Sequence, residues 1–231
     1  MSSKQTTRAI TYLAMFIAMY VILKLIGEMV PILKMPNGGS IELELIAVFL
    51  AGFYIDWRFG AMTAILSWLL TIVLGFTMYF VHPVQVVLDY LIPVTVCGLA
   101  PILWPLKNVT KTTALGISIA VGVFAVIGTL MGYGISVLSV VSGILIGAAI
   151  FAFSFWYLKG ERRFGIVTAM LLKYFSTVLS GAYFWAEGAA AGSMPAWIFS
   201  LNYNLGYNLV TMAVCIFAVP LILDRLPKNG L

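Results

Sequence analysis

Long apolar runs, placed one after another, constrain this chain more than any other feature of its sequence. The first extends from about residue 9 to residue 33, and others follow with only short polar breaks. A helix needs roughly 17–25 mainly apolar residues to cross a bilayer, where its backbone groups must bond to one another. The pattern predicts an all-α polytopic membrane protein, with one membrane domain over residues 1–231.

We expect about eight membrane spans in this chain. The second is short, and the fifth and sixth are separated only by a glycine-containing turn at 131–134. That pair is predicted as two spans, with a re-entrant unit as the alternative. The approximate ranges are 9–33, 43–56, 60–81, 83–105, 112–132, 135–158, 164–186 and 196–223.

The basic residues indicate the orientation of the spans, because Lys and Arg gather in cytoplasmic loops. With an even number of spans and the N-terminus inside, ten of the thirteen fall on the cytoplasmic side. These ten are Lys4, Arg8, Arg58, Lys107, Lys111, Lys159, Arg162, Arg163, Arg225 and Lys228. We therefore expect a cell-membrane protein with both termini cytoplasmic. The net charge of +5 is interpreted as an orientation signal and not as a sign of nucleic-acid binding.

Two charged side chains, Asp89 and Lys173, interrupt the apolar runs. A charge at a helix centre costs about 2.5–3.5 kcal/mol on insertion scales, so such residues usually face a cavity and serve a function. Gln85 lies one helical turn before Asp89, and Tyr90 adds a ring with a hydroxyl. The alternative is a structural Asp89–Lys173 ion pair that holds two helices together.

A stripe of residues at four-residue spacing follows Lys173 along the seventh span. Thr177, Gly181 and Trp185 add a hydroxyl, a bare stretch of backbone and a large aromatic ring. A ligand that lies along this stripe would stack on Trp185 and meet polar groups deeper in the membrane. The alternatives are helix packing at Gly181 and an interfacial anchor at Trp185.

Two further segments carry candidate binding residues. The loop at 34–42 contains Asn37 and Gly38, and its adjacent glycines suit a tight turn in an extracellular lid. The last predicted span carries Phe199 and Asn204 near its start, among other polar and aromatic residues. For Asn204, the alternative to a ligand contact is a hydrogen bond between helices. In contrast, Glu42 and Glu44 are expected to be solvated loop residues.

Four motifs occur in order along the chain: PNGGSI (36–41), HPVQVVLDY (82–90), KYFSTVLSGAYFWAE (173–187) and FSLNYN (199–204). Together they resemble the thiamine-specific substrate-binding subunits of energy-coupling-factor (ECF) vitamin transporters. The resemblance covers about residues 8–105 and 164–223.

The resemblance implies a six-helix bundle that binds thiamine from outside beneath the 34–42 lid. Transport then requires a transmembrane coupling protein and two ABC ATPases, and the subunit itself is not an enzyme and holds no cofactor. The resemblance also implies a docking motif of small residues on the first helix, which Ala14 and Ala18 match. Residues 108–160 lie outside it and are predicted to form an inserted helical hairpin.

The resemblance also implies roles for individual residues. It places ligand contacts at Asp89, Tyr90, Lys173, Gly181, Trp185 and Asn204. Members of the family usually carry glutamate where Asp89 stands, histidine at Thr177 and tyrosine at Phe199. The first change shortens the reach of the carboxylate, and the other two remove an imidazole and a hydroxyl.

Three other functions remain open on the sequence. One is a binding subunit for another small aromatic or cationic nutrient, such as a thiamine precursor. A second is a self-contained secondary transporter with Asp89 and Lys173 as a proton relay. The third is an intramembrane enzyme, which the sequence disfavours because it contains no recognisable nucleophile–base pair and a single histidine, His82.

Overall fold

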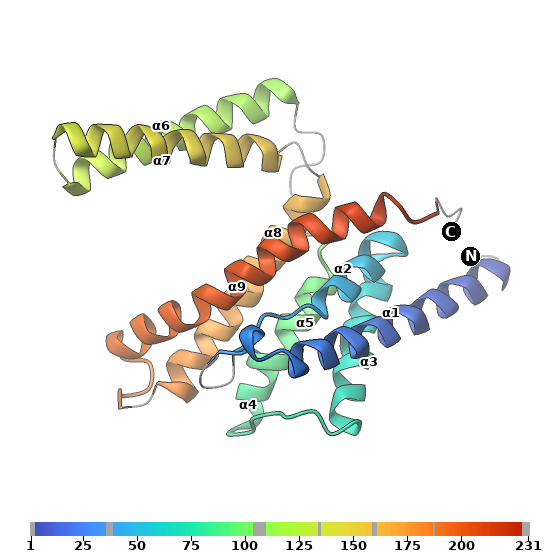
Figure 1. Ribbon diagram of the computed structural model, residues 1–231. Coiled ribbons are helices and arrows are strands. Elements are labelled where there is room, and N and C mark those ends of the chain that lie inside the picture. The colour runs from blue at the N-terminus through green and yellow to red at the C-terminus, as the bar shows by residue number, and fades with distance from the viewer. Residues whose placement is uncertain are drawn as a thin grey trace. The chain divides into compact units, whose positions relative to one another are not determined.

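Helices make up nearly all of the regular structure in the described part of the chain. The computed structural model describes residues 3–35, 39–103, 110–133, 135–158, 161–186 and 188–227. The chain divides into two compact units (Figure 1). Unit 1 comprises Met1–Leu103 with Gly165–Leu231, and unit 2 comprises Trp104–Phe164.

Unit 1 contains the helices that build the candidate site. In chain order its elements are α1 (Ser3–Met29), the short 3-10 helix η1 (Pro31–Leu33), α2 (Leu45–Tyr54), α3 (Trp57–Val73), α4 (Pro83–Val86), η3 (Val87–Leu91), α5 (Ile92–Gly98), α8 (Glu161–Ser180), η4 (Gly181–Trp185) and α9 (Met194–Leu223). α4, η3 and α5 form one continuous helical segment, and η4 extends α8. Counted in this way, the described part of unit 1 has six helical segments besides the three-residue η1.

The short helix α2 lies at the centre of unit 1. It contacts α1, α3, α5 and α9, and all its residues from Leu45 to Gly52 are buried. A helix that is apolar on every side is stable only when other elements surround it. Small residues permit this crowding, because a Cβ added to Gly60 of α3 would lie 2.3 Å from the carbonyl oxygen of Gly98 in α5.

Unit 2 is a pair of helices, α6 (Lys111–Tyr133) and α7 (Val137–Leu158). They pack along each other (Figure 1). A Cβ at Gly147 would lie 2.9 Å from the carbonyl oxygen of Gly122, so glycine permits the close approach of the two backbones. The unit includes the predicted hairpin at 108–160. That this hairpin is an insertion stays a prediction.

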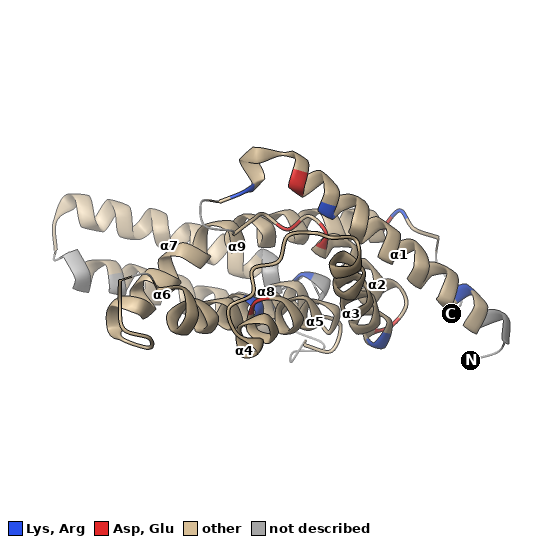
Figure 2. Cartoon of the chain, turned by 90° about the horizontal axis from the view of Figure 1, so that it is seen from below, with Lys and Arg blue, Asp and Glu red and all other residues tan. Residues whose placement is uncertain are grey.

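The helices are long and apolar enough for a membrane protein. By length and composition, four of the described helices qualify as complete spans: Thr6–Met29, Val137–Phe155, Arg163–Trp185 and Met194–Leu223. Shorter apolar helices accompany them. Charged residues are few and scattered along the helices (Figure 2). The prediction of an all-α polytopic membrane fold is confirmed.

The third predicted segment, 60–81, is too long. α3 ends at Val73, the chain turns at Gly75 with φ +77°, and residues 76–82 are irregular. We call residues 76–82 the second loop. α4 then begins at Pro83, where Nδ1 of His82 accepts a hydrogen bond from the Val84 amide at 3.2 Å.

Candidate ligand-binding cavity

A cavity of about 700 Å³ lies within unit 1. Its volume falls in the range of about 300–1,000 Å³ that is typical of small-molecule sites. Seven residues singled out in the sequence contribute to its wall. They are Asp89 and Tyr90 of η3, Thr177 of α8, Gly181 and Trp185 of η4, and Phe199 and Asn204 of α9.

Two other predicted residues, Gln85 and Lys173, are not part of the lining. Gln85 is completely buried, and Lys173 is only 1% exposed. Each bonds to residues that do line the cavity. Asn37 and Gly38 lie outside the described residues.

Asp89 is held by two donors from different helices. Gln85 Nε2 donates to Asp89 Oδ2 at 2.7 Å, and Trp185 Nε1 donates to the same oxygen at 2.8 Å. The tryptophan indole is therefore fixed edge-on to the carboxylate, with its ring in the cavity wall. Hydrogen bonds to the ionised form of a carboxylate stabilise its charge.

Both partners of the Asp89–Trp185 bond lie in π-helical turns, η3 and η4. The sequence explains η3, because Pro93 has no amide hydrogen to continue an α-helical ladder. The Ile92 amide bonds instead to the Val87 carbonyl, and Ser176 of α8 donates to the freed Leu88 carbonyl at 2.7 Å. π-turns inside helices are frequent at functional sites. The position of Pro93 was the sequence signal for this turn.

Lys173 does not pair with Asp89, as the alternative of a structural Asp89–Lys173 ion pair required. Its Nζ donates to Asn208 Oδ1 at 2.8 Å and lies 2.9 Å from Glu42 Oε2, in an ion pair without hydrogen-bond geometry. It also lies 5.6 Å from the centre of the Tyr207 ring. The structure thus pairs Lys173 with the loop before α2 and not with Asp89.

Glu42 and Glu44 are the main residues that the sequence analysis missed. Both line the cavity, and Glu44 is 3% exposed, so the prediction that they are solvated was wrong. Lys24 of α1 neutralises Glu44 at 2.9 Å. The signal in the sequence was Lys24 itself, a cation within the first span that needed an anionic partner.

The charges around the cavity do not balance evenly. Four carboxylates belong to its lining: Glu28, Glu42, Glu44 and Asp89. The first three pair with Lys34, Lys173 and Lys24 respectively. Among the described residues, Asp89 is the lining carboxylate without a lysine or arginine partner. The cavity therefore offers a negative group that a cationic ligand can neutralise.

The later part of the predicted lid at 34–42 contacts α9. Lys34 and Ser40 form an isolated antiparallel bridge, which brings the two ends of the loop together. The Gly39 amide donates to Tyr203 Oη at 3.0 Å, and the Glu42 amide donates to Thr211 Oγ1 at 3.1 Å. A Cβ at Gly39 would lie 2.8 Å from the Tyr207 ring, so the glycine permits this approach.

α9 supplies an aromatic and amide face. The rings of Phe199 and Tyr203 stack with their centres 5.8 Å apart. Asn204 Nδ2 donates to the Ser200 carbonyl at 2.9 Å, and Asn204 Oδ1 accepts from Tyr207. Asn204 thus has partners within α9 although it lines the cavity. Gly181 is a contact point of η4 with the same face, since a Cβ there would lie 2.1 Å from Ser200 Oγ.

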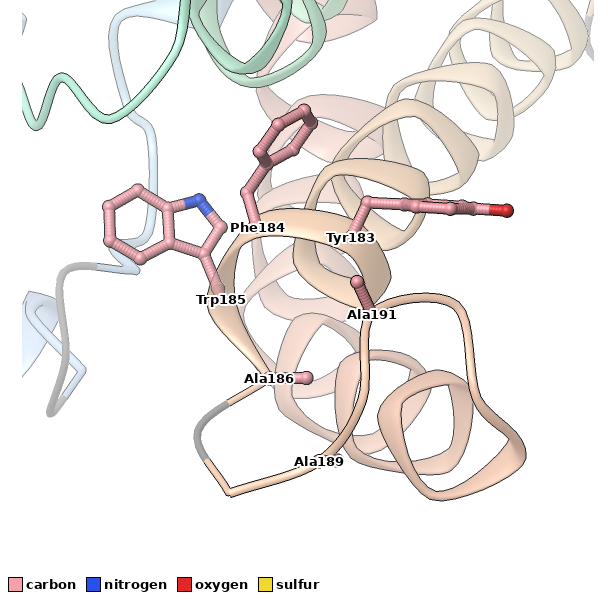
Figure 3. Close-up of a pocket in the computed structure, with 6 residues that line it drawn as sticks. All are labelled: Tyr183, Phe184, Trp185, Ala186, Ala189 and Ala191. Atoms are coloured by element: carbon pink, nitrogen blue, oxygen red, sulfur yellow. The ribbon is translucent and has the colours of Figure 1, made fainter.

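A second, smaller hollow of about 270 Å³ lies beside the turn that follows η4 (Figure 3). Tyr183, Phe184 and Trp185 contribute rings to it, and Trp185 belongs to both hollows. In Figure 3 the Trp185 and Tyr183 side chains point to opposite sides of the backbone. Trp185 therefore turns toward Asp89, whereas Tyr183 packs edge-on against Trp197 with ring centres 6.2 Å apart.

The family described as thiamine transporter protein (Thia_YuaJ) matches residues 10–156 and 158–229. The chain belongs to this family. A curated relative, the thiamine transporter ThiT of Bacillus subtilis (strain 168), is 30% identical over 226 residues, covering 98% of this chain and 95% of the relative.

A solved structure supports the same fold. That structure is of ThiT from Listeria monocytogenes, and it matches with a TM-score of 0.59 and 17% sequence identity. The match covers 96% of this chain and 97% of that one. The protein is therefore a multi-pass membrane protein with the fold of ThiT, and its relatives are named as transporters.

Proposed function

We propose that this protein binds thiamine from outside the cell and is the substrate-binding subunit of an ECF importer. The single observation that carries the proposal is Asp89, a carboxylate without a cationic partner among the described residues, in a cavity of about 700 Å³. Thiamine has a permanently charged thiazolium ring, an aminopyrimidine and a hydroxyl. The names of the relatives point to the same ligand.

The cavity wall suits an aromatic cation. Tyr90, Trp185 and Tyr203 present rings to the same space as Asp89. A cation over such a ring gains about 0.5–2 kcal/mol, more when water is excluded. The Asp89 carboxylate balances the thiazolium or accepts from the pyrimidine amine, which gives a stronger hydrogen bond than a neutral acceptor would.

We further propose that the remaining predicted residues act around the same ligand. Thr177, Gly181, Phe199 and Asn204 form the wall along which it lies, with Asn37 and Gly38 in the lid above it. Asn204 contacts the ligand only by exchanging one of its present hydrogen bonds. Lys173 supports the base of the lid through Glu42 and does not touch the ligand.

Import requires energy from partner proteins in this proposal. Docking to the coupling protein uses the side of α1 that faces away from the bundle. Ala14 and Ala18 are exposed there and permit close approach of another helix. Both termini are cytoplasmic. A self-contained proton relay has lost its support, because Lys173 pairs with Glu42 and Asn208. The chain itself is not an enzyme in this proposal.

The proposal is tested by titrating purified protein with thiamine while following tryptophan fluorescence. Trp185→Phe is the control that identifies the responding ring, and the neutral aminopyrimidine fragment is the control for charge. We expect quenching at submicromolar thiamine, a much weaker response to the fragment, and a reduced signal in the variant. The absence of any response up to millimolar thiamine would contradict the assignment and direct the search to other cationic nutrients.

The partner requirement needs its own measurement. Vesicles that contain the protein alone are expected to bind thiamine without accumulating it. Accumulation should appear only when the coupling protein and ATPases are reconstituted with it and ATP is supplied. Uptake by the protein alone, driven by a proton gradient, would favour a secondary transporter.

A further inference from the structure

Gln85 connects the Asp89 carboxylate to the second loop, residues 76–82. Its Nε2 donates to Asp89 Oδ2 at 2.7 Å, and its Oε1 accepts from the Val81 amide at 3.2 Å. The side chain is completely buried. A glutamine amide has both a donor and an acceptor, so one side chain satisfies both neighbours at once.

The other neighbours of Asp89 contact the same loop. Tyr90, the next residue, accepts a hydrogen bond at its Oη from the Tyr79 amide at 3.0 Å. Trp185, the other donor to Asp89, packs edge-on against the Tyr79 ring with centres 6.2 Å apart. Gln85 and Trp185, which donate to the carboxylate, and the adjacent Tyr90 therefore all contact the second loop.

The second loop covers part of the cavity. Phe76, Thr77, Met78 and Tyr79 belong to the cavity lining, and the loop is irregular between α3 and α4. Its backbone amides at Tyr79 and Val81 bond to side chains of the η3 region and not to a regular ladder. Such a segment opens at low cost once those few bonds are lost.

We propose that Gln85 is a positioning residue that couples the ligand's charge at Asp89 to closure of the second loop. This inference rests on the proposed function. A cationic ligand fixes the Asp89 carboxylate, the carboxylate fixes the Gln85 amide, and the amide holds the Val81 backbone. The second loop then slows escape of the ligand, independently of the lid at 34–42.

The test combines two readouts on the purified full-length protein. The first is the dissociation rate of thiamine. The second is the hydrogen–deuterium exchange rate of the backbone amides in residues 76–82, where the Tyr79 and Val81 amides donate to Tyr90 and Gln85.

Gln85→Met keeps an unbranched side chain of similar length but removes both hydrogen bonds. We expect thiamine to dissociate about tenfold faster, because the variant loses about one to two hydrogen bonds that hold the loop closed. We also expect thiamine to slow amide exchange in the second loop several-fold with Gln85 present and not at all in Gln85→Met. Val84→Leu, on the exposed side of α4, is the matched control and should behave like the parent.

Val81→Pro removes the loop's donor and leaves Gln85 intact. The position lies outside the helices, so the variant remains informative where Gln85→Met fails to fold. The two changes should be non-additive, because both break one connection. Unchanged dissociation and unchanged protection in these variants, with thiamine still bound by the parent, would overturn the inference alone. A parent that does not bind thiamine would instead contradict the proposed function.

Discussion

Asp89 and Lys173 are two charges buried among apolar helices of the same unit, and the structure treats them in opposite ways. Lys173 is 1% exposed, and its ammonium group is matched by Glu42 and Asn208. Asp89 is partly buried in the wall of the cavity, where the neutral donors Gln85 and Trp185 bond to it and no lysine or arginine of the described residues pairs with it.

This difference separates a structural charge from the charge that we propose binds the ligand. An ion taken out of water requires a partner, and Lys173 finds it within the protein. Asp89 is bonded to neutral donors, and hydrogen bonds of this kind favour the ionised carboxylate without cancelling its charge, which would leave a negative potential available to the cavity. The comparison suggests that an intramembrane charge binds ligand when its compensation within the protein is incomplete.

The largest expected effect comes from breaking the structural charge. Lys173→Met leaves Glu42 and Asn208 without their buried partner, which typically costs about 3–5 kcal/mol. We expect a clear drop in the thermal unfolding temperature of the purified protein. Adding Glu42→Gln should recover part of the loss. An unchanged unfolding temperature with lost thiamine binding would instead indicate that Lys173 contacts the ligand directly.

Removing the Asp89 charge should have the reverse effect of the Lys173 change, with a loss of thiamine affinity and little loss of stability. Asp89→Asn keeps the shape of the side chain, so we expect a nearly unchanged unfolding temperature. Thiamine affinity should fall about 10–100-fold, since hydrogen bonds to charged groups contribute about 1.5–3 kcal/mol. Titration with thiamine and with its neutral pyrimidine fragment checks this. Equal weakening for both ligands would argue against a role for charge.

A smaller effect is expected at the donor that orients Asp89. Trp185→Phe keeps an aromatic ring but removes the Nε1 hydrogen bond to Oδ2. A net loss of about 1 kcal/mol corresponds to roughly fivefold weaker binding. Calorimetric titration is suitable here, because the fluorescence signal is altered by the substitution. A loss as large as that of Asp89→Asn would mean that ring stacking dominates.

The smallest effect is expected at the exposed Lys34–Glu28 pair. Its atoms are 2.6 Å apart, but the side chains are 44% and 35% exposed. Exposed pairs contribute about 0–1 kcal/mol and are screened by salt. Lys34→Met should therefore change neither the unfolding temperature nor thiamine affinity by more than a small amount. A large change would show that the cavity entrance depends on this pair.

The sequence by itself determined the all-α membrane class and the approximate ranges of most helices. Local patterns suffice for this, because hydrophobic length and helical periodicity are properties of a continuous segment. The same reasoning selected Asp89, Thr177, Gly181 and Trp185, which the structure places around one cavity. Their role as ligand contacts stays a prediction.

Only the tertiary structure decided which charges are paired. Lys173 meets Glu42, and Lys24 meets Glu44, across long stretches of chain that no local pattern connects. The π-turns around Asp89 and Trp185 likewise depend on contacts with neighbouring helices, although Pro93 marked one of them. The physical reason is that electrostatic compensation depends on distance in space, and helix packing sets that distance.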